Sequence, residues 1–138
     1  MIKIKKVENI LYPEIFQTEY IYAYNKFNKE LKEIIEYSGY KKEFIRKYRK
    51  CLKFLEALRE NCIKQKSFEK LSDCENIYSM RLIGEKNIRI LFTFIKKGER
   101  KFTVLLYAFQ EKDDKKNSKY SYNYAIGIAQ TRIKEILE

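Results

Sequence analysis

The chain has 138 residues, a length typical of one domain with its own hydrophobic core. Its 30 Lys and Arg residues outnumber 19 Asp and Glu residues, so the formal net charge is +11. A small protein with this excess attracts polyanions, so nucleic acid, the ribosome or an acidic protein are the expected partners. The chain has no histidine, which excludes Ser-His and Cys-His catalysis and argues against a zinc site.

The cysteines and the distribution of apolar residues exclude further classes of protein. Cys51, Cys62 and Cys74 form no CxxC pair of the type found in metal and redox sites. No apolar run approaches the roughly 18–20 residues of a membrane span. Charged residues occupy the N-terminus, where a signal peptide needs an apolar core. We therefore expect a cytoplasmic protein that needs neither a metal nor another cofactor.

Residues 1–24 are the hardest part of the chain to interpret. Ile2 and Ile4 alternate with lysines, and residues 16–22 are rich in β-forming side chains. One or two strands are therefore expected in this N-terminal extension.

Two helices are predicted between residues 25 and 58. The first ends at Ser38-Gly39 and has one apolar face, made of Phe27, Leu31, Ile34 and Ile35. The second begins near Lys41, and its apolar stripe consists of Phe44, Tyr48, Cys51, Leu52, Leu55 and Leu58. We expect a helical hairpin with charged outer faces, in which Cys51 is a small core residue.

Three strands are predicted next, over residues 77–83, 87–95 and 101–109, with turn sequences between them. The last element, residues 120–137, has the apolar spacing of a helix at Tyr122, Ala125, Ala129, Ile133 and Ile136. The chain is therefore predicted to be a single α+β domain over residues 1–138. In this fold the helical hairpin and the C-terminal helix pack on a small twisted antiparallel sheet.

The alternation of apolar residues in the first two of these strands predicts the register in which they pair. If Arg81 lies opposite Arg89, the strands share a wholly apolar face made of Tyr78, Met80, Leu82, Ile88, Ile90, Phe92 and Phe94. The other face then carries both arginines together with Ser79, Thr93, Thr103 and Tyr107. A slip of one residue would drive both arginines into the core, so the register that pairs them is favoured.

Two like charges that face each other across a strand pair destabilise a sheet modestly. An anion between Arg81 and Arg89 would remove the repulsion, and the planar donor fork of arginine matches a phosphate bidentately. Alternatively, Glu75, Glu85 or another carboxylate at the sheet edge neutralises them. The sequence leaves both interpretations open.

A charged loop, residues 111–119, follows the last predicted strand. Its lysines at 112, 115 and 116 could reach the face that holds the arginines, although most such runs are solvated loops. Tyrosines cluster around this loop, among them Tyr107 and Tyr120. Tyrosines at helical spacing are usually half-buried, but one at the edge of a groove could stack on a base.

RNA cleavage without a metal needs a base for the 2′-hydroxyl, positive charge on the phosphate and an acid for the leaving oxygen. Without histidine the base must be a glutamate, a tyrosine or a lysine whose pKa is lowered by neighbouring cations. We hypothesise that Arg81 and Arg89 bind the phosphate, while Lys112, with Glu111 or a nearby tyrosine, transfers protons. The candidate RNA contacts are Lys115, Lys116, Tyr107 and Tyr120.

The order of motifs in residues 76–137 resembles the HigB-type, phage-related branch of the RelE/ParE toxin superfamily. The matching segments are Ile-Tyr-Ser-Met-Arg at 77–81, Ile-Arg-Ile-Leu-Phe at 88–92 and Leu-Leu-Tyr-Ala-Phe at 105–109. Lys112, Ala129 and Arg132 follow in the order of the family pattern. The chain departs from that pattern at Glu111, where the family commonly has a lysine.

The resemblance implies a RelE-like fold and a type II toxin of a toxin–antitoxin system. Such toxins cleave mRNA in the ribosomal A site until a cognate antitoxin neutralises them, so the implied partners are the antitoxin, mRNA and the ribosome. It implies catalytic roles for Arg81, Arg89 and Lys112, and it adds Arg132 to the candidate RNA contacts. Two alternatives remain: a ParE-like toxin that binds DNA gyrase, and an inactive basic binding protein.

Overall fold

The computed structural model describes residues 5–72, 74–82, 84, 87–111 and 121–138. In chain order its elements are β1 (Val7–Glu8), β2 (Ile21–Tyr24), α1 (Phe27–Ile35), α2 (Lys41–Leu58), the 3-10 helix η1 (Arg59–Lys64), β3 (Phe68–Lys70), β4 (Tyr78–Leu82), β5 (Ile88–Lys97), β6 (Arg100–Gln110) and α3 (Tyr122–Leu137). The strands form one six-stranded sheet in the order β1-β2-β6-β5-β4-β3. The predicted α+β class is confirmed.

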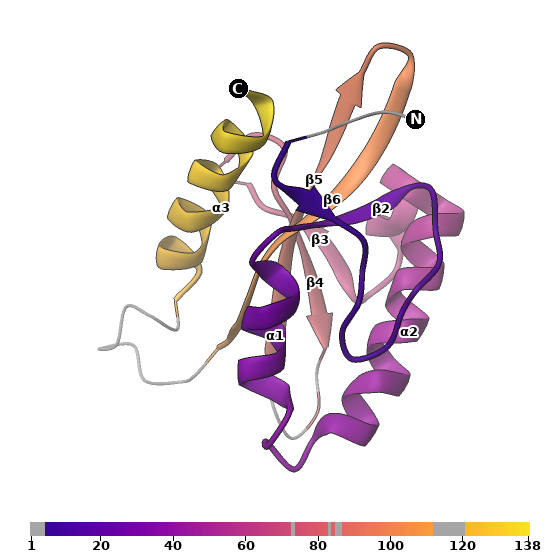
Figure 1. The fold of residues 1–138 in the computed structure, drawn as a ribbon, viewed down its shortest axis with the longest axis vertical. Coiled ribbons are helices and arrows are strands. Elements are labelled where there is room, and N and C mark those ends of the chain that lie inside the picture. Colours follow the sequence, from indigo (N-terminus) through magenta and orange to yellow (C-terminus); the bar gives the residue numbers. More distant parts are fainter. Residues whose placement is uncertain (1–4, 73, 83, 85–86, 112–120) are drawn as a thin grey trace.

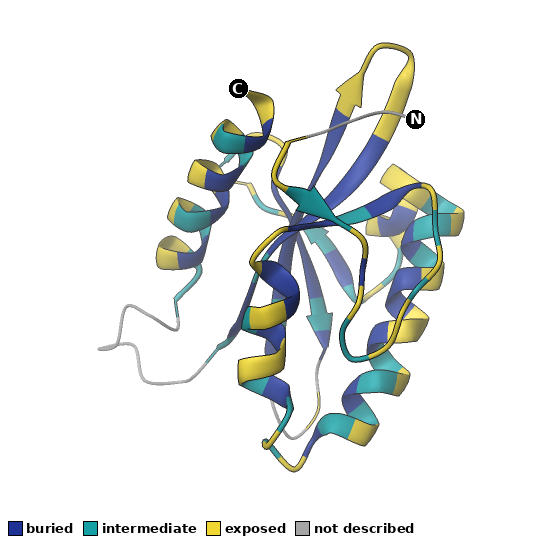
Figure 2. Ribbon diagram, viewed as in Figure 1, coloured by how far each residue is buried: buried dark blue, intermediate teal, exposed yellow. Residues whose placement is uncertain are grey.

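The helices surround the sheet rather than sharing one face of it. Figure 1 shows α2 and α3 on opposite sides of the strands, with α1 beside β6. The strands and the inner faces of the helices are buried, while the outer faces of the helices and the tip of the β5–β6 hairpin are exposed (Figure 2). One hydrophobic core therefore unites the elements.

The N-terminal segment supplies two strands, as expected, but their pairing was not foreseen. β2 runs parallel to β6, with Ile21 opposite Thr103 and Ala23 opposite Leu105, whereas the other described strand pairs are antiparallel. The sheet is therefore mixed, and the prediction of a purely antiparallel sheet is wrong at this pair. A parallel pair needs a long crossover, and here the chain between β2 and β6 provides it.

Both helices of the predicted hairpin are confirmed. The apolar side of α1 is buried through Phe27, Leu31 and Ile35, and that of α2 through Phe44, Tyr48, Cys51, Leu52 and Leu55. The C-terminal helix begins after Ser121, whose hydroxyl accepts a hydrogen bond from the backbone N–H of Tyr124 at 3.2 Å. A serine in this position satisfies an N–H group that the first turn leaves unpaired.

The register of β4 and β5 is the predicted one: Arg81 lies opposite Arg89. The residues of the predicted apolar face are all buried, and Met80, Ile88, Ile90 and Phe92 are fully so. The helix α2 contacts β4, and Leu82 of this face lines a hollow together with side chains of that helix.

The third strand of the predicted polar face is interrupted by a β-bulge. Leu91 lies opposite Tyr107 but Phe92 lies opposite Leu105, which leaves Leu106 as an extra residue in β6. Tyr107 therefore shares the face of Arg89, as predicted. Thr103 lies opposite Phe94 on the apolar face, so its predicted place beside the arginines is wrong, because one inserted residue reverses the alternation of a strand.

A buried ion pair joins α3 to α1. Arg132 Nη1 and Nη2 donate to the two carboxylate oxygens of Glu30 at 2.6 and 2.5 Å. Arg132 Nη1 also donates to the carbonyl of Leu106, the bulge residue, at 2.8 Å. The guanidinium lies 4.5 Å from the ring centroid of Tyr24. The bidentate pair fixes the position of α3 against α1, and the bond to Leu106 joins α3 to β6.

Replacing Arg132 with Met should reduce the free energy of unfolding by about 2–4 kcal/mol, because it leaves Glu30 without its partner. We expect a smaller loss of unfolding free energy than for a fully buried pair, because 27% of the Glu30 side chain is exposed. Urea unfolding measures the change. Adding Glu30→Gln to Arg132→Met should recover part of the loss in unfolding free energy. If the double variant lost as much unfolding free energy as the two single variants together, a direct pair would be contradicted.

Burial raises the pKa of the Cys51 thiol to about 11 and that of Cys62 to about 12. Both groups therefore stay protonated and poorly nucleophilic at mildly alkaline pH. Cys74 is partly exposed. An aromatic disulfide reagent should modify one thiol in the native protein and all three after unfolding. Fast native reaction of a Cys74→Ser variant would contradict this assignment.

Candidate functional site

Arg89 and Glu111 form an ion pair where β5 begins and β6 ends. Arg89 Nε donates to Glu111 Oε2 at 3.1 Å. The Arg89 side chain is only 13% exposed, whereas that of Glu111 is 37% exposed. The backbone N–H of Glu111 donates to the carbonyl of Asn87 at 2.8 Å, so the sheet hydrogen bonding continues to this residue. Sequence reasoning assigned both residues to catalysis, and the structure places them in contact.

Tyr122 adds a hydroxyl group to the same region. Its Oη lies 3.0 Å from Ser79 Oγ, and its ring meets Phe109 edge to face with centroids 5.3 Å apart. Burial raises the pKa of Tyr122; the charge of Arg89 lowers it, and that of Glu111 raises it. The phenol is therefore protonated at neutral pH. Tyr122 was not among the predicted site residues, because its spacing placed it on the apolar side of the C-terminal helix.

Arg81 turns away from Arg89 despite standing opposite it. Its Nη2 donates to the carbonyl of Lys66 at 2.5 Å, and its backbone N–H donates to the carbonyl of Ser67 at 2.7 Å. Of the two neutralising carboxylates considered from the sequence, Glu75 is exposed and pairs with neither arginine, and Glu85 lies outside the described residues. A carboxylate at the end of the sheet, Glu111, pairs with Arg89.

Each arginine keeps one buried nitrogen that has no hydrogen-bond partner among the described residues: Nε of Arg81 and Nη1 of Arg89. An unpaired buried donor costs about 1–3 kcal/mol, and more when it carries charge. Among the described side chains the pair of arginines is matched by one carboxylate, which leaves an excess positive charge. An anion bound beside these arginines would offset that charge.

The remaining predicted site residues divide into two groups. Lys112, Lys115, Lys116 and Tyr120 lie outside the described residues. Tyr107 is half-buried, and the Arg132 guanidinium lies 5.4 Å from its ring centroid. Arg132 itself is 9% exposed and paired with Glu30, so we assign it to the structure of the domain rather than to RNA contact. The structure thus groups Arg89, Glu111 and Tyr122, with Arg81 on the neighbouring strand.

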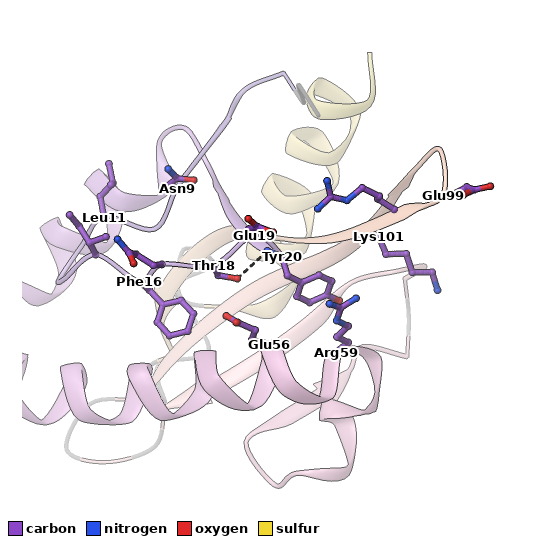
Figure 3. Close-up of a pocket in the computed structure, with 13 residues that line it drawn as sticks. Asn9, Leu11, Phe16, Thr18, Glu19, Tyr20, Glu56, Arg59, Glu99 and Lys101 are labelled. Carbon is purple, nitrogen blue, oxygen red and sulfur yellow. Dashed lines mark hydrogen bonds between the residues drawn. The ribbon is translucent and has the colours of Figure 1, made fainter. Parts of the chain in front are cut away.

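A hollow of about 920 Å³ lies elsewhere, between the N-terminal loop, the end of α2 and the turn between β5 and β6 (Figure 3). Arg59 lies over the ring of Tyr20, 4.2 Å from its centroid. Three glutamates and three basic residues line the hollow, so their charges balance. None of the predicted site residues lines it.

Across the described part of the chain, no cluster of three or more His, Cys, Asp or Glu side chains has the arrangement of a metal site. None of the described helices combines the length and apolar character needed to cross a membrane. Comparisons with protein-family models, with curated proteins and with solved structures found no match.

The geometry predicts how the carboxylate controls anion binding. Replacing Glu111 with Gln removes the charge paired with Arg89, so inorganic sulfate should bind about two- to fivefold more tightly, the range expected for a partly exposed pair. Thermal shift titrations at constant ionic strength measure this affinity. The matched control is Glu99→Gln, which removes an exposed charge at the β5–β6 turn. Equal gains in both variants would show a general charge effect and contradict a local site.

Proposed function

We propose that the protein is a metal-independent endoribonuclease that cleaves mRNA on the ribosome, as the toxin of a type II toxin–antitoxin pair. The observation that carries the proposal is the pair of cross-strand arginines, each with a buried donor that lacks a partner among the described residues. The scissile phosphate of RNA is an anion that the charge of these two arginines would attract, and positive charge there stabilises the transition state of phosphoryl transfer.

The neighbouring groups suit the two proton transfers of such a reaction. The 2′-hydroxyl attacks the adjacent phosphorus, its proton passes to a base, and the departing 5′-oxygen receives a proton from an acid. Glu111 is the carboxylate beside Arg89, and we assign it the role of base. Tyr122 has a protonated hydroxyl in the same region, and we assign it the role of acid. Lys112, which follows Glu111, belongs to the proposal through the family resemblance.

The wider features of the chain support the toxin assignment without depending on this chemistry. The order of motifs in residues 76–137 resembles HigB-type toxins, and the α+β fold agrees with that class. The net charge of +11 suits a protein that works against ribosomal RNA and mRNA. Under this proposal the partners are the ribosome with its mRNA and a cognate antitoxin, and the protein acts in the cytoplasm.

Controlled expression in bacterial cells, followed by mapping of mRNA ends, tests the proposal. The wild type should arrest growth and produce new breaks in phase with codons. Arg89→Ala should lower cleavage about 10²–10³-fold, because it removes a donor to the phosphate. Tyr122→Phe should lower it by about 10²-fold or more, because it removes the acid.

Two controls make the outcome specific. Arg100→Ala removes an exposed arginine from the β5–β6 turn and should leave cleavage unchanged. Circular dichroism of each purified variant separates a loss of activity from a loss of folding, and Arg89→Lys provides a second variant that keeps the positive charge. Arrest with DNA damage and intact messages would overturn the proposal in favour of a gyrase-binding toxin. The absence of arrest in the wild type would overturn both.

A further inference from the structure

A second hollow, of about 640 Å³, lies between α2, the segment that leads into β3, and the end of β4. Six basic side chains line it: Arg46, Lys47 and Lys50 from α2, Lys64 and Lys66 from the segment before β3, and Arg81 from β4. No carboxylate is present among the described residues that line it. We name it the cationic hollow.

The charge of the cationic hollow is unusual for a folded surface. Like charges at neighbouring positions repel one another, and surface cations are usually interspersed with acids. The balanced lining of the larger hollow near Tyr20 shows that the same chain does intersperse them elsewhere. The backbone brings the six cations together from three segments, and Lys47 is paired with Glu43 at 3.1 Å, whereas the other five have no carboxylate partner among the ion pairs of the described residues. Their repulsion is relieved when a polyanion binds and releases its counterions.

The floor of the cationic hollow is apolar. It is formed by Cys51, Phe54 and Leu82, of which Phe54 is half-buried. Lys50 Nζ lies 5.9 Å from the centroid of the Phe54 ring. Cys51 does not add charge, because burial raises its pKa to about 11 and keeps it a neutral thiol. An aromatic ring in a hollow lined by cations is the combination that binds single-stranded nucleic acid, in which bases stack while phosphates contact basic groups.

We propose that the cationic hollow is a second RNA-binding site that holds the phosphates and one base of a single-stranded segment. Arg81 lines the hollow and also stands opposite Arg89, so the hollow adjoins the end of β4 that carries the candidate site. The choice of RNA as the polymer rests on the proposed function. Binding in the hollow does not require cleavage, so the two can fail separately.

The test measures binding of the full-length protein to a short fluorescein-labelled 2′-O-methyl oligouridylate by anisotropy. The 2′-O-methyl group removes the attacking hydroxyl, so the affinity is independent of catalysis. Arg46→Glu/Lys50→Glu should weaken binding about tenfold or more at low salt. The slope of log affinity against log salt should fall by about 1.4, which corresponds to two phosphate contacts on a single strand.

The matched control is Lys42→Glu/Lys53→Glu, which makes the same change of charge on the same helix at exposed positions outside the hollow. We expect the control to weaken binding much less than the hollow variant does. The slope of log affinity against log salt should stay that of the wild type. Equal losses in the two double variants would overturn the proposal, because they would show a field effect of net charge. Unchanged binding in the hollow variant would also overturn it.

Phe54→Leu tests the stacked base. It should weaken binding of the oligouridylate about fivefold or more, and the same variant should bind an abasic oligonucleotide as well as the wild type does. A similar loss with both ligands would contradict stacking. Polyglutamate of matched charge serves as a competitor. If it displaces the RNA as effectively as unlabelled oligouridylate does, the hollow is a docking site for an acidic protein, and the RNA proposal is overturned.

Discussion

The apolar face that β4 and β5 share determines where the two arginines stand. Met80, Ile88 and Ile90 are fully buried on that face, so a shift of one residue would exchange them for charged side chains. The cost of such an exchange exceeds the modest repulsion between arginines across a strand pair, which lies within about 1 kcal/mol. The sheet therefore holds Arg81 opposite Arg89, and the candidate site depends on this constraint.

Positive charge is distributed unevenly around these two arginines. Arg89 is paired with Glu111, whereas Arg81 donates to a carbonyl and joins the cationic hollow. The larger hollow near Tyr20 has a balanced lining by comparison. Six of the basic residues thus meet in one region that includes the end of β4. This placement connects the proposed cleavage site and the proposed second binding site through a single shared side chain, Arg81.

Much of the fold could be predicted because the period of apolar residues is clear in α1, α2, β4 and β5. The register of the arginines followed from the same alternation. The parallel pairing of β2 with β6 could not be predicted, since local sequence carries no information about which distant strand is the neighbour. At the site, Glu111 was predicted, and its contact with Arg89 depends on where β6 ends. The burial of Arg132 was missed because its partner, Glu30, lies 102 residues earlier in the chain.

The bulge in β6 links two positions that look independent in the sequence. The extra residue, Leu106, offers its carbonyl to Arg132, which lies 26 residues further along the chain. A related chain without the extra residue would have an uninterrupted strand and would lack the carbonyl of Leu106 that accepts from Arg132. The residue at position 132 therefore indicates whether β6 contains the bulge. The alternation of apolar residues in β6 does not reveal the bulge by itself. Insertions in β6 and substitutions at position 132 should accordingly be inherited together.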